Sequence, residues 1–186
     1  YEGETTDIFD FQDRIAAQVA AAIHPAVRLA EIEATRRRPP GSLRAHELVL
    51  QAWPRIWAQN AADNDQAILL LRQAIEADPA YGRAHALLAW GHSQYVIYLW
   101  TKDAAADRRA AARAVEDAIG LIANDPTALA AAGAALSQCL GELDRAETLI
   151  EAALALDPNN AWAWQRHGWL GIFRNDPDAA MARFRR

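Results

Sequence analysis

Five histidines and one cysteine are the side chains of this 186-residue sequence best suited to acid–base or metal chemistry. No two histidines have the His-Glu-x-x-His spacing of a zinc protease, and none lies beside the cysteine at zinc-finger spacing. Cys139 stands among Ala and Leu, which is typical of a buried thiol, with a reactive thiol as the alternative. We therefore expect no catalytic, cofactor-binding or metal-binding residues and no enzymatic activity. The histidines, interpreted as helix-packing or groove residues, are His24, His46, His85, His92 and His167.

A short acidic motif, Asp63-Asn64-Asp65, hints at a calcium-binding loop. Such loops also need a Gly for the sharp turn and a closing Glu, and the motif lacks both. The sequence also lacks a Gly-rich phosphate-binding loop and a hydrolase nucleophile elbow. We expect the motif to form a turn that connects two helices.

Internal repetition indicates which elements position the remaining residues of interest. Residues 74–79, 118–123 and 153–158 end alike, and a new helical stretch begins two residues after each. Pro79 and Pro158 are expected to stop the preceding helices, because proline lacks the amide donor and clashes with the turn before it. A small residue recurs inside each opening helix, where a larger side chain would hold neighbouring helices apart: Ala52, Ala89, Gly133 and Gly168.

From about Ser42 to its end, the chain resembles the tetratricopeptide repeat (TPR), whose units are helix pairs of about 34 residues. The resemblance implies an all-α fold, a right-handed α-solenoid of TPR helix pairs preceded by a long kinked N-terminal helix. We expect an N-terminal helix and linker in residues 1–41 and the array in residues 42–186. Its units are expected at about 42–81, 82–125, 126–160 and a truncated 161–186. The second unit is longer than the others, which predicts a first helix running through residues 95–100 and a second from about Asp103, with a smaller insertion in the first unit at residues 60–64.

The first helices of TPR pairs line a concave groove. Reading each of them at positions i, i+3, i+7 and i+10 predicts a protein-binding lining with one basic residue of certain charge, Arg83. Trp53, Trp90 and Trp169 each follow a small residue directly, and indole rings supply a large contact area at low entropic cost. The lining predicts a partner protein or peptide segment of apolar or amphipathic character. The alternative is that adjacent helices or the chain's own opening helix bury these rings. The predicted lining is His46, Val49, Trp53, Ile56, Arg83, Ala86, Trp90, Ser93, Thr127, Ala130, Ala134, Ser137, Trp162, Gln165, Trp169 and Ile172.

Other tryptophans, Trp57, Trp100 and Trp164, are assigned to the core or to a ledge formed by residues 95–100. The opening segment carries an apolar stripe of helical period, which predicts the N-terminal helix. Pro25 is expected to kink this helix, and Arg36 to Arg38 lie at its end. Residues 7–15, together with residues 44–48 that lead into the repeats, resemble the C-terminal regions of bacterial class III adenylate/guanylate cyclases that carry TPRs. Winged-helix transcriptional activators have a similar tail.

The cyclase resemblance implies a larger bacterial signalling protein, of which this chain is a non-catalytic regulatory scaffold. A homo-oligomerisation module of that parent is the alternative, since cyclase domains of this class work as dimers. A net charge of −5 argues against nucleic-acid and anionic-membrane binding. The apolar runs are too short for a membrane helix, and a single cysteine fits a reducing compartment, so we expect a cytoplasmic protein.

Overall fold

The computed structural model describes residues 40–185 of the chain. The predicted N-terminal helix, its kink at Pro25 and the Arg36 to Arg38 run lie outside the described residues. The chain divides into two compact units, residues 1–43 and 44–186, and the account below concerns the second, together with the helix that leads into it.

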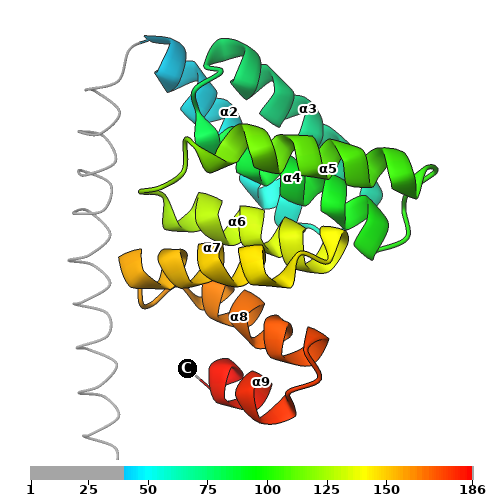
Figure 1. Cartoon of the computed structure of the whole chain (residues 1–186). Coiled ribbons are helices and arrows are strands. Elements are labelled where there is room, and N and C mark those ends of the chain that lie inside the picture. Colours follow the sequence, from blue (N-terminus) through cyan, green and yellow to red (C-terminus); the bar gives the residue numbers. More distant parts are fainter. Residues whose placement is uncertain (1–39, 186) are drawn as a thin grey trace, which may run out of the picture. The chain divides into compact units, whose positions relative to one another are not determined.

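Eight α-helices and one π-helical turn make up the described part of the chain, which contains no β-strand. They pack as successive antiparallel pairs, α2–α3, α4–α5, α6–α7 and α8–α9, which follow one another from top to bottom in Figure 1. This arrangement confirms the predicted all-α solenoid. The elements are α2 (Pro40–Trp57), α3 (Ala61–Ala77), α4 (Gly82–Ile97), α5 (Ala104–Ile119), α6 (Pro126–Ala135), η1 (Leu136–Leu140), α7 (Leu143–Leu156), α8 (Ala161–Phe173) and α9 (Pro177–Phe184).

Side-chain caps begin most of these helices. An Asn or Asp oxygen accepts a hydrogen bond from the backbone N–H three residues on, which satisfies a donor that the first helical turn leaves unpaired. Pro126 and Pro177 open α6 and α9 at a position where no amide donor is needed. The capping residues are Asn60, Asp103, Asp125, Asn160 and Asp176. Local sequence therefore determines where these helices start.

The recurring small residues lie at buried positions, and the two glycines among them lie at close contacts between helices, as predicted. Ala52 and Ala89 are fully buried. A Cβ added to Gly133 would lie 2.7 Å from the Ile150 side chain of α7, and one added to Gly168 would lie 2.4 Å from the Phe184 ring of α9. A larger residue at either position would force the facing side chain or the helix to move. The small residues at Gly133 and Gly168 thus permit the close packing of the third and fourth helix pairs.

Two predicted boundaries are wrong. The first helix of the second unit does not run through residues 95–100: α4 ends at Ile97, and Leu99, with φ +59°, turns the chain towards α5. Part of the extra length of this unit therefore lies in the α4–α5 connection, and α5 begins at Ala104, close to the predicted start at Asp103. Asp63-Asn64-Asp65 is not a connecting turn either, because α3 starts at Ala61 and includes all three residues. Asn64 is buried there and donates a hydrogen bond to the Gly91 carbonyl of α4, which ties the two helices together.

The third unit ends its first helix with the π-helical turn η1. Gly141, with φ +76°, follows it in the left-handed conformation that glycine adopts without strain. The Glu142 amide donates back to the Leu136 carbonyl, which closes the turn. Among the described helices, none combines the length and the apolarity that crossing a bilayer requires.

Candidate functional site

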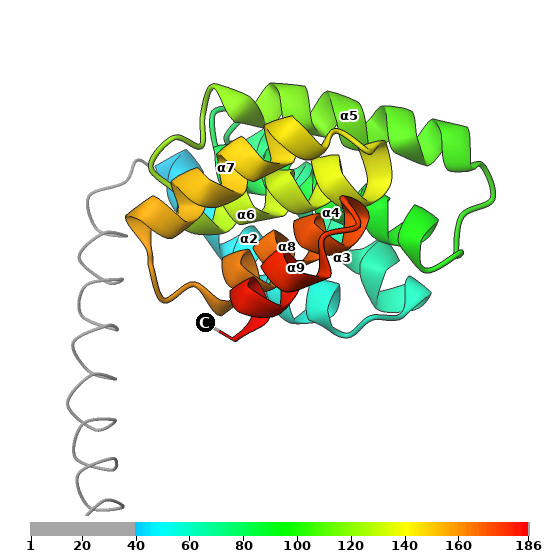
Figure 2. The same cartoon turned by 60° about the horizontal axis from the view of Figure 1, so that its bottom comes forward.

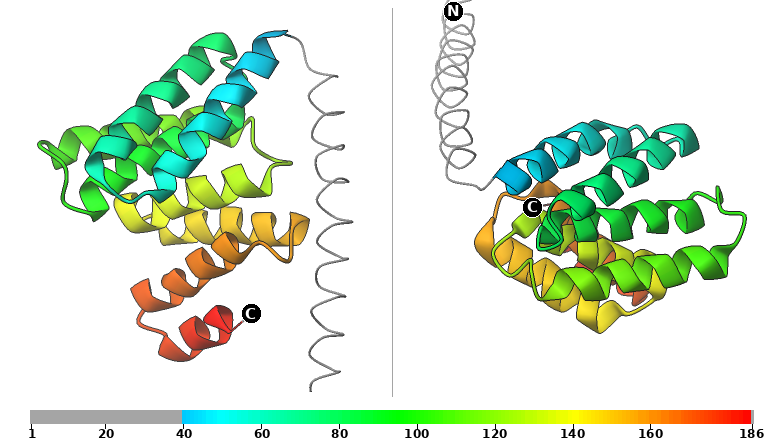
Figure 3. Two further views of the ribbon diagram at one scale, coloured as in Figure 1. Left: turned by 180° about the vertical axis from the view of Figure 1, so that it is seen from behind. Right: turned by 90° about the horizontal axis from the view of Figure 1, so that it is seen from above.

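The first helices of the pairs, α2, α4, α6 and α8, form what we call the inner face. α2 lies in front in the left panel of Figure 3, whereas α5 and α7 lie in front from the opposite side, in Figure 1. Half of the predicted lining is buried: Val49, Ile56, Ala86, Trp90, Ser93, Ala130, Ala134 and Ser137. The half-buried members are His46, Trp53, Arg83, Thr127 and Trp162, and the exposed ones are Gln165, Trp169 and Ile172.

Four indole rings meet on the inner face and form the tryptophan cluster, which consists of Trp53, Trp57, Trp90 and Trp162. The ring centroid of Trp162 on α8 lies 5.0 Å from that of Trp57, 6.1 Å from that of Trp90 and 6.3 Å from that of Trp53. All three contacts are edge-to-face, the geometry that the aromatic quadrupole favours. Helix α8 of the fourth pair therefore reaches α2 of the first pair and α4 of the second.

Small side chains on α6 make this convergence possible. Its inner-face positions are Thr127, Ala130, Ala134 and, just after the helix, Ser137, none of them large. Ala130 and Ala134 are fully buried in the same core cluster as Trp90, and Trp53 and Trp162 pack against that cluster. The indoles from α2, α4 and α8 thus occupy the hollow that large residues on α6 would fill. Trp90 is buried by adjacent helices, as the alternative interpretation of the indole rings expected. Trp57, in contrast, keeps 38% of its surface exposed.

Arg166 on α8 lies beneath the tryptophan cluster. Its guanidinium carbon is 5.0 Å from the ring centroid of Trp90 and 5.9 Å from that of Trp162, within the range of cation–π attraction. The residue is only 8% exposed, and this burial lowers the pKa of Arg166 to about 10. Its Nη2 donates to the Gln165 Oε1, 2.7 Å away, but its Nε has no hydrogen-bond partner.

This arginine carries a buried positive charge that no carboxylate of the described residues neutralises. The indole Nε1 of Trp162, one helical turn away, is likewise buried without a hydrogen-bond partner. Two unused donors beside aromatic rings suit a group that accepts hydrogen bonds and carries negative charge. Reading the helix at i, i+3, i+7 and i+10 missed Arg166, which lies four residues after Trp162. An arginine at i+4 from an inner-face tryptophan, on a helix with no acid nearby, is the signal that could have found it.

The polar members of the predicted lining have partners of their own. Arg83 Nε lies 2.6 Å from the Asp125 Oδ2, so its charge is neutralised within the protein. His46 Nδ1 lies 3.0 Å from the Tyr81 hydroxyl. A small cavity of about 130 Å³ joins three helices of the inner face, and its lining is Val49, Leu50, Trp53, Arg83 and Thr127.

A second exposed apolar group lies at the α8–α9 end of the array, which faces the viewer in Figure 2. The rings of Trp169 and Phe173 stack with centroids 5.8 Å apart, and both are about two-fifths exposed. We call this group the end patch, and its members are Trp169, Ile172, Phe173, Met181 and Phe184. Trp169 also belongs to the predicted lining, so the end patch continues the inner face along α8.

A group of possible metal ligands on α7 and α8 has arginines beside it. Ligand atoms of Glu147, Glu151 and His167 lie within 4.8 Å of one another. Arg174 and Arg183 both pair with Glu147, and these cations oppose the binding of a metal ion there. Burial, helped by Arg183, lowers the pKa of His167.

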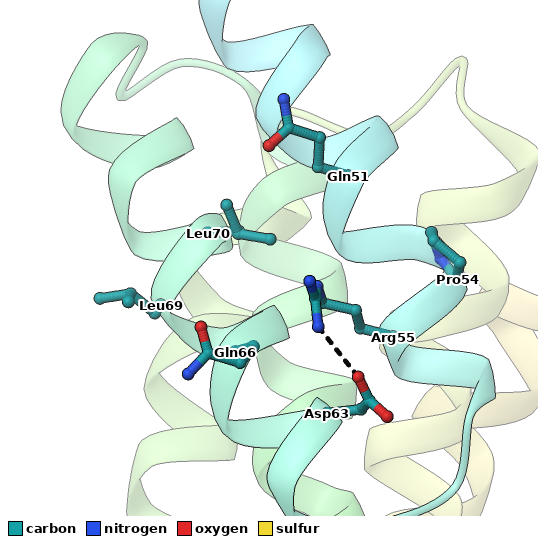
Figure 4. A pocket seen from close by; sticks show the side chains of 7 residues that line it. All are labelled: Gln51, Pro54, Arg55, Asp63, Gln66, Leu69 and Leu70. Atoms are coloured by element: carbon teal, nitrogen blue, oxygen red, sulfur yellow. Dashed lines mark hydrogen bonds and ion pairs between the residues drawn. The ribbon is translucent and has the colours of Figure 1, made fainter.

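Two pockets flank α3. The first, of about 480 Å³, lies between α2 and α3, where Arg55 faces Asp63 at 2.9 Å (Figure 4). The second, of about 550 Å³, lies among α3, α4 and α5. Its Asp65 accepts a hydrogen bond from the Tyr95 hydroxyl, and its Asp107 accepts one from Thr101. The acids in both pockets therefore have partners already. The cations Arg72 and Lys102 of the second pocket are exposed to solvent, unlike the buried Arg166.

Cys139 is buried at the end of η1, and this burial raises the pKa of its thiol. A raised pKa leaves little thiolate at neutral pH, so the residue has the properties of a small core side chain rather than of a nucleophile.

Comparisons with known proteins show the fold but no family. No family model matches the chain, and no curated protein sequence matches it. Fourteen chains of solved structures do match. One of them is described as the crystal structure of MamA; its TM-score is 0.50 at 18% sequence identity, and the match covers 94% of this chain and 89% of that chain. At this identity the similarity establishes a common TPR-like architecture.

Proposed function

We propose that this chain is a non-catalytic scaffold that binds a segment of another protein on its inner face. The observation that carries the proposal is the tryptophan cluster, where rings from three helix pairs meet and Trp57 stays 38% exposed. Trp and Arg are enriched among the residues that contribute most to binding at protein interfaces. The TPR-like fold is consistent with this role, because stacked helix pairs create extended binding surfaces.

Selection of binding peptides tests this function. Random peptides displayed on phage would be selected on the immobilised full chain, and we expect enrichment of sequences with apolar or aromatic residues. Trp57→Ala and Trp169→Ala should weaken binding of the enriched peptides, because both side chains are exposed, Trp57 within the tryptophan cluster and Trp169 at a position of the predicted lining. Trp100→Ala, in the α4–α5 connection, is the control and should bind as the unmodified chain does. Circular dichroism would establish that each variant keeps its helicity; failure to enrich any peptide would refute the proposal.

A homo-oligomerisation module is the second candidate function, and the end patch favours it. Its five large apolar side chains are 39–51% exposed, an unusual concentration on two short helices. A symmetric contact between two such patches would bury them. Light scattering at increasing protein concentration tests this idea: a mass that doubles in the unmodified chain and stays monomeric in Met181→Glu supports it, and a constant monomer mass rejects it.

The parent protein is part of the proposal. We infer a larger bacterial signalling protein of the cyclase type from the resemblance of residues 7–15 and 44–48 described above, and a cytoplasmic location from the single cysteine. The first of these segments lies outside the described residues, so the inference rests on sequence alone. A winged-helix regulator is the alternative parent, and the reading frame upstream of Tyr1 would distinguish the two.

A further inference from the structure

We propose that the inner face recognises an acidic side chain of its partner, which binds the guanidinium of Arg166 beside the rings of Trp90 and Trp162. This inference rests on the proposed function and adds the chemistry of the bound segment. It identifies the occupant as a peptide with a glutamate or aspartate next to an apolar or aromatic residue.

The charge of Arg166 is the first part of the argument. Arg166 is 92% buried as a residue, which removes much of the hydration of its guanidinium, and proteins normally compensate such a loss with a paired carboxylate. Among the described residues, the ion pairs near α8 use other arginines: Glu147 pairs with Arg174 and Arg183, and Asp144 pairs with Arg174. Arg166 has only the neutral amide oxygen of Gln165 and the faces of two indoles. A negative group from outside the described chain would complete the site.

The shape of the site determines which anion fits. A single guanidinium offers a few directed donors, which match the planar, singly charged carboxylate. The Arg166 Nε and the indole Nε1 of Trp162 are buried, so they can donate to a ligand only after the surrounding side chains move aside. A phosphate dianion would bring a second charge that no other cation at this site neutralises. Because only 8% of the surface of Arg166 is exposed, a slender Asp or Glu side chain can approach it more easily than a bulky anion can. The partly exposed Trp57, in contact with Trp162, can then pack against the neighbouring apolar residue.

Peptide selection provides the test. Displayed peptides fused to the phage through their C-terminal ends have no free terminal carboxylate, so any acidity must come from side chains. On the full chain we expect enrichment of one acidic residue beside an apolar or aromatic one. Replacing that residue in the synthetic peptide, Glu by Gln or Asp by Asn, should weaken binding about tenfold, as expected for a charge-assisted hydrogen bond. Arg166→Met should weaken binding of the acidic peptide to the same degree and should no longer distinguish the acid from its amide.

Stability separates a binding role of Arg166 from a structural one. Replacing a buried, unpaired charge by an apolar side chain of similar length removes a desolvation cost. We therefore expect Arg166→Met to unfold in urea at the same or a higher concentration than the unmodified chain. Arg109→Met, at an exposed position of α5, is the matched control and should change neither stability nor binding.

Each outcome has a defined meaning. Enriched peptides without an acidic preference, or equal binding of acid and amide forms, would overturn this inference and leave the scaffold function standing. Displacement of the peptide by inorganic phosphate would identify a general anion site and would also overturn it. An Arg166→Met variant that binds poorly only because it unfolds more easily would contradict it as well. Absence of any enriched peptide would refute the scaffold function itself.

Discussion

His92 is a buried polar residue whose pKa is changed by the helices packed around it. It lies in α4 with 7% of its surface exposed, and its Nδ1 is 3.5 Å from the Asp107 Oδ1 of α5. Burial lowers the pKa of His92, and the charges of Arg72 and Arg113 lower it further, while Asp107 opposes the change. The imidazole is therefore held neutral in the folded chain at pH values where an exposed histidine is already protonated.

This lowered pKa predicts acid sensitivity with a definite sign. The unfolded chain, whose histidine pKa is about 6.5, binds the proton more readily than the folded chain does. The contribution of His92 to stability is thus present above pH 6.5 and is lost as pH falls below it, with a slope of at most about 1.4 kcal/mol per pH unit. His92→Gln should flatten the decline of the unfolding free energy in urea between about pH 6.5 and 5. If the unfolding free energy of the two proteins declines in parallel over this pH range, His92 is not the cause of the decline.

Leu99 is a second residue whose surroundings are unfavourable for its side chain, in both backbone conformation and solvent exposure. Its φ of +59° lies in the left-handed region, and 85% of its surface is exposed. A side chain with a Cβ pays steric strain in this conformation and gains no burial here.

Leu99→Gly should therefore raise the unfolding free energy by about 1 kcal/mol, because glycine adopts this conformation without strain. Leu99→Ala is the matched control: it removes the exposed side chain but retains the Cβ, so it should leave stability nearly unchanged. Thermal unfolding of the three proteins measures the difference. An equal gain in both variants would attribute the effect to surface hydrophobicity instead of to strain.

The α8–α9 hairpin shows how pairs of helices constrain individual positions. Gly168 and Gly171, three residues apart on α8, both face α9. A Cβ on Gly171 would lie 2.7 Å from the backbone nitrogen of Ala180 and 2.9 Å from its Cα. The obstacle is backbone, which cannot rotate away as the end of a side chain can. The hairpin therefore depends on glycine at this position in spite of the low helix propensity of glycine.

Gly171→Ala should destabilise the chain by about 1–2 kcal/mol, since the steric cost exceeds the propensity gain. Gly120→Ala provides the opposite case, because φ is −71° there and no atom lies within 4 Å of an added Cβ. That variant should be neutral or more stable by about 0.5 kcal/mol. Urea unfolding monitored by circular dichroism measures both. A Gly171→Ala variant as stable as Gly120→Ala would show that α9 can shift without cost.

At the scale of the whole array, Trp162 connects pairs that are far apart in sequence. In most solenoids each repeat contacts only its neighbours, so stability is a sum of local terms. Here the ring of Trp162 on α8 contacts Trp53 and Trp57 on α2, so the first and fourth helix pairs share one aromatic cluster. This contact should couple the unfolding of the two ends of the array.

A double-mutant cycle measures that coupling. Trp53→Ala and Trp162→Ala should each destabilise the chain, and the double variant should lose about 1 kcal/mol less than the sum of the two. Trp53→Ala with Trp164→Ala is the control pair, because the Trp164 ring lies against His167 and its Nε1 donates to the Pro158 carbonyl. These two losses should add to within about 0.5 kcal/mol. Additivity in both pairs would mean that the ends unfold independently.

Local chemistry accounts for what the sequence predicted well. Prolines and capping residues act within one turn of their own positions, so the ends of α3 and α7 ahead of Pro79 and Pro158 could be predicted. Small residues at helical spacing predicted the close approaches at Gly133 and Gly168 and the buried positions of Ala52 and Ala89, because two helices can approach closely only where both surfaces carry small side chains. The end of α4 was missed because no proline or glycine marks it, and Leu99 adopts its left-handed turn against its own preference.

The residues of the candidate site divide in the same way. Periodicity placed Trp53, Trp90 and Trp162 on one face of their helices, a property of each helix by itself. The contacts among these rings and Trp57, and the burial of Arg166 next to them, have a different origin. They depend on the convergence of α2, α4 and α8 over the small residues of α6. Such convergence is the sum of many small packing rotations along the array, and no single segment of sequence encodes it. Only the tertiary structure decides, therefore, which indoles stay exposed and which charge is left without a partner.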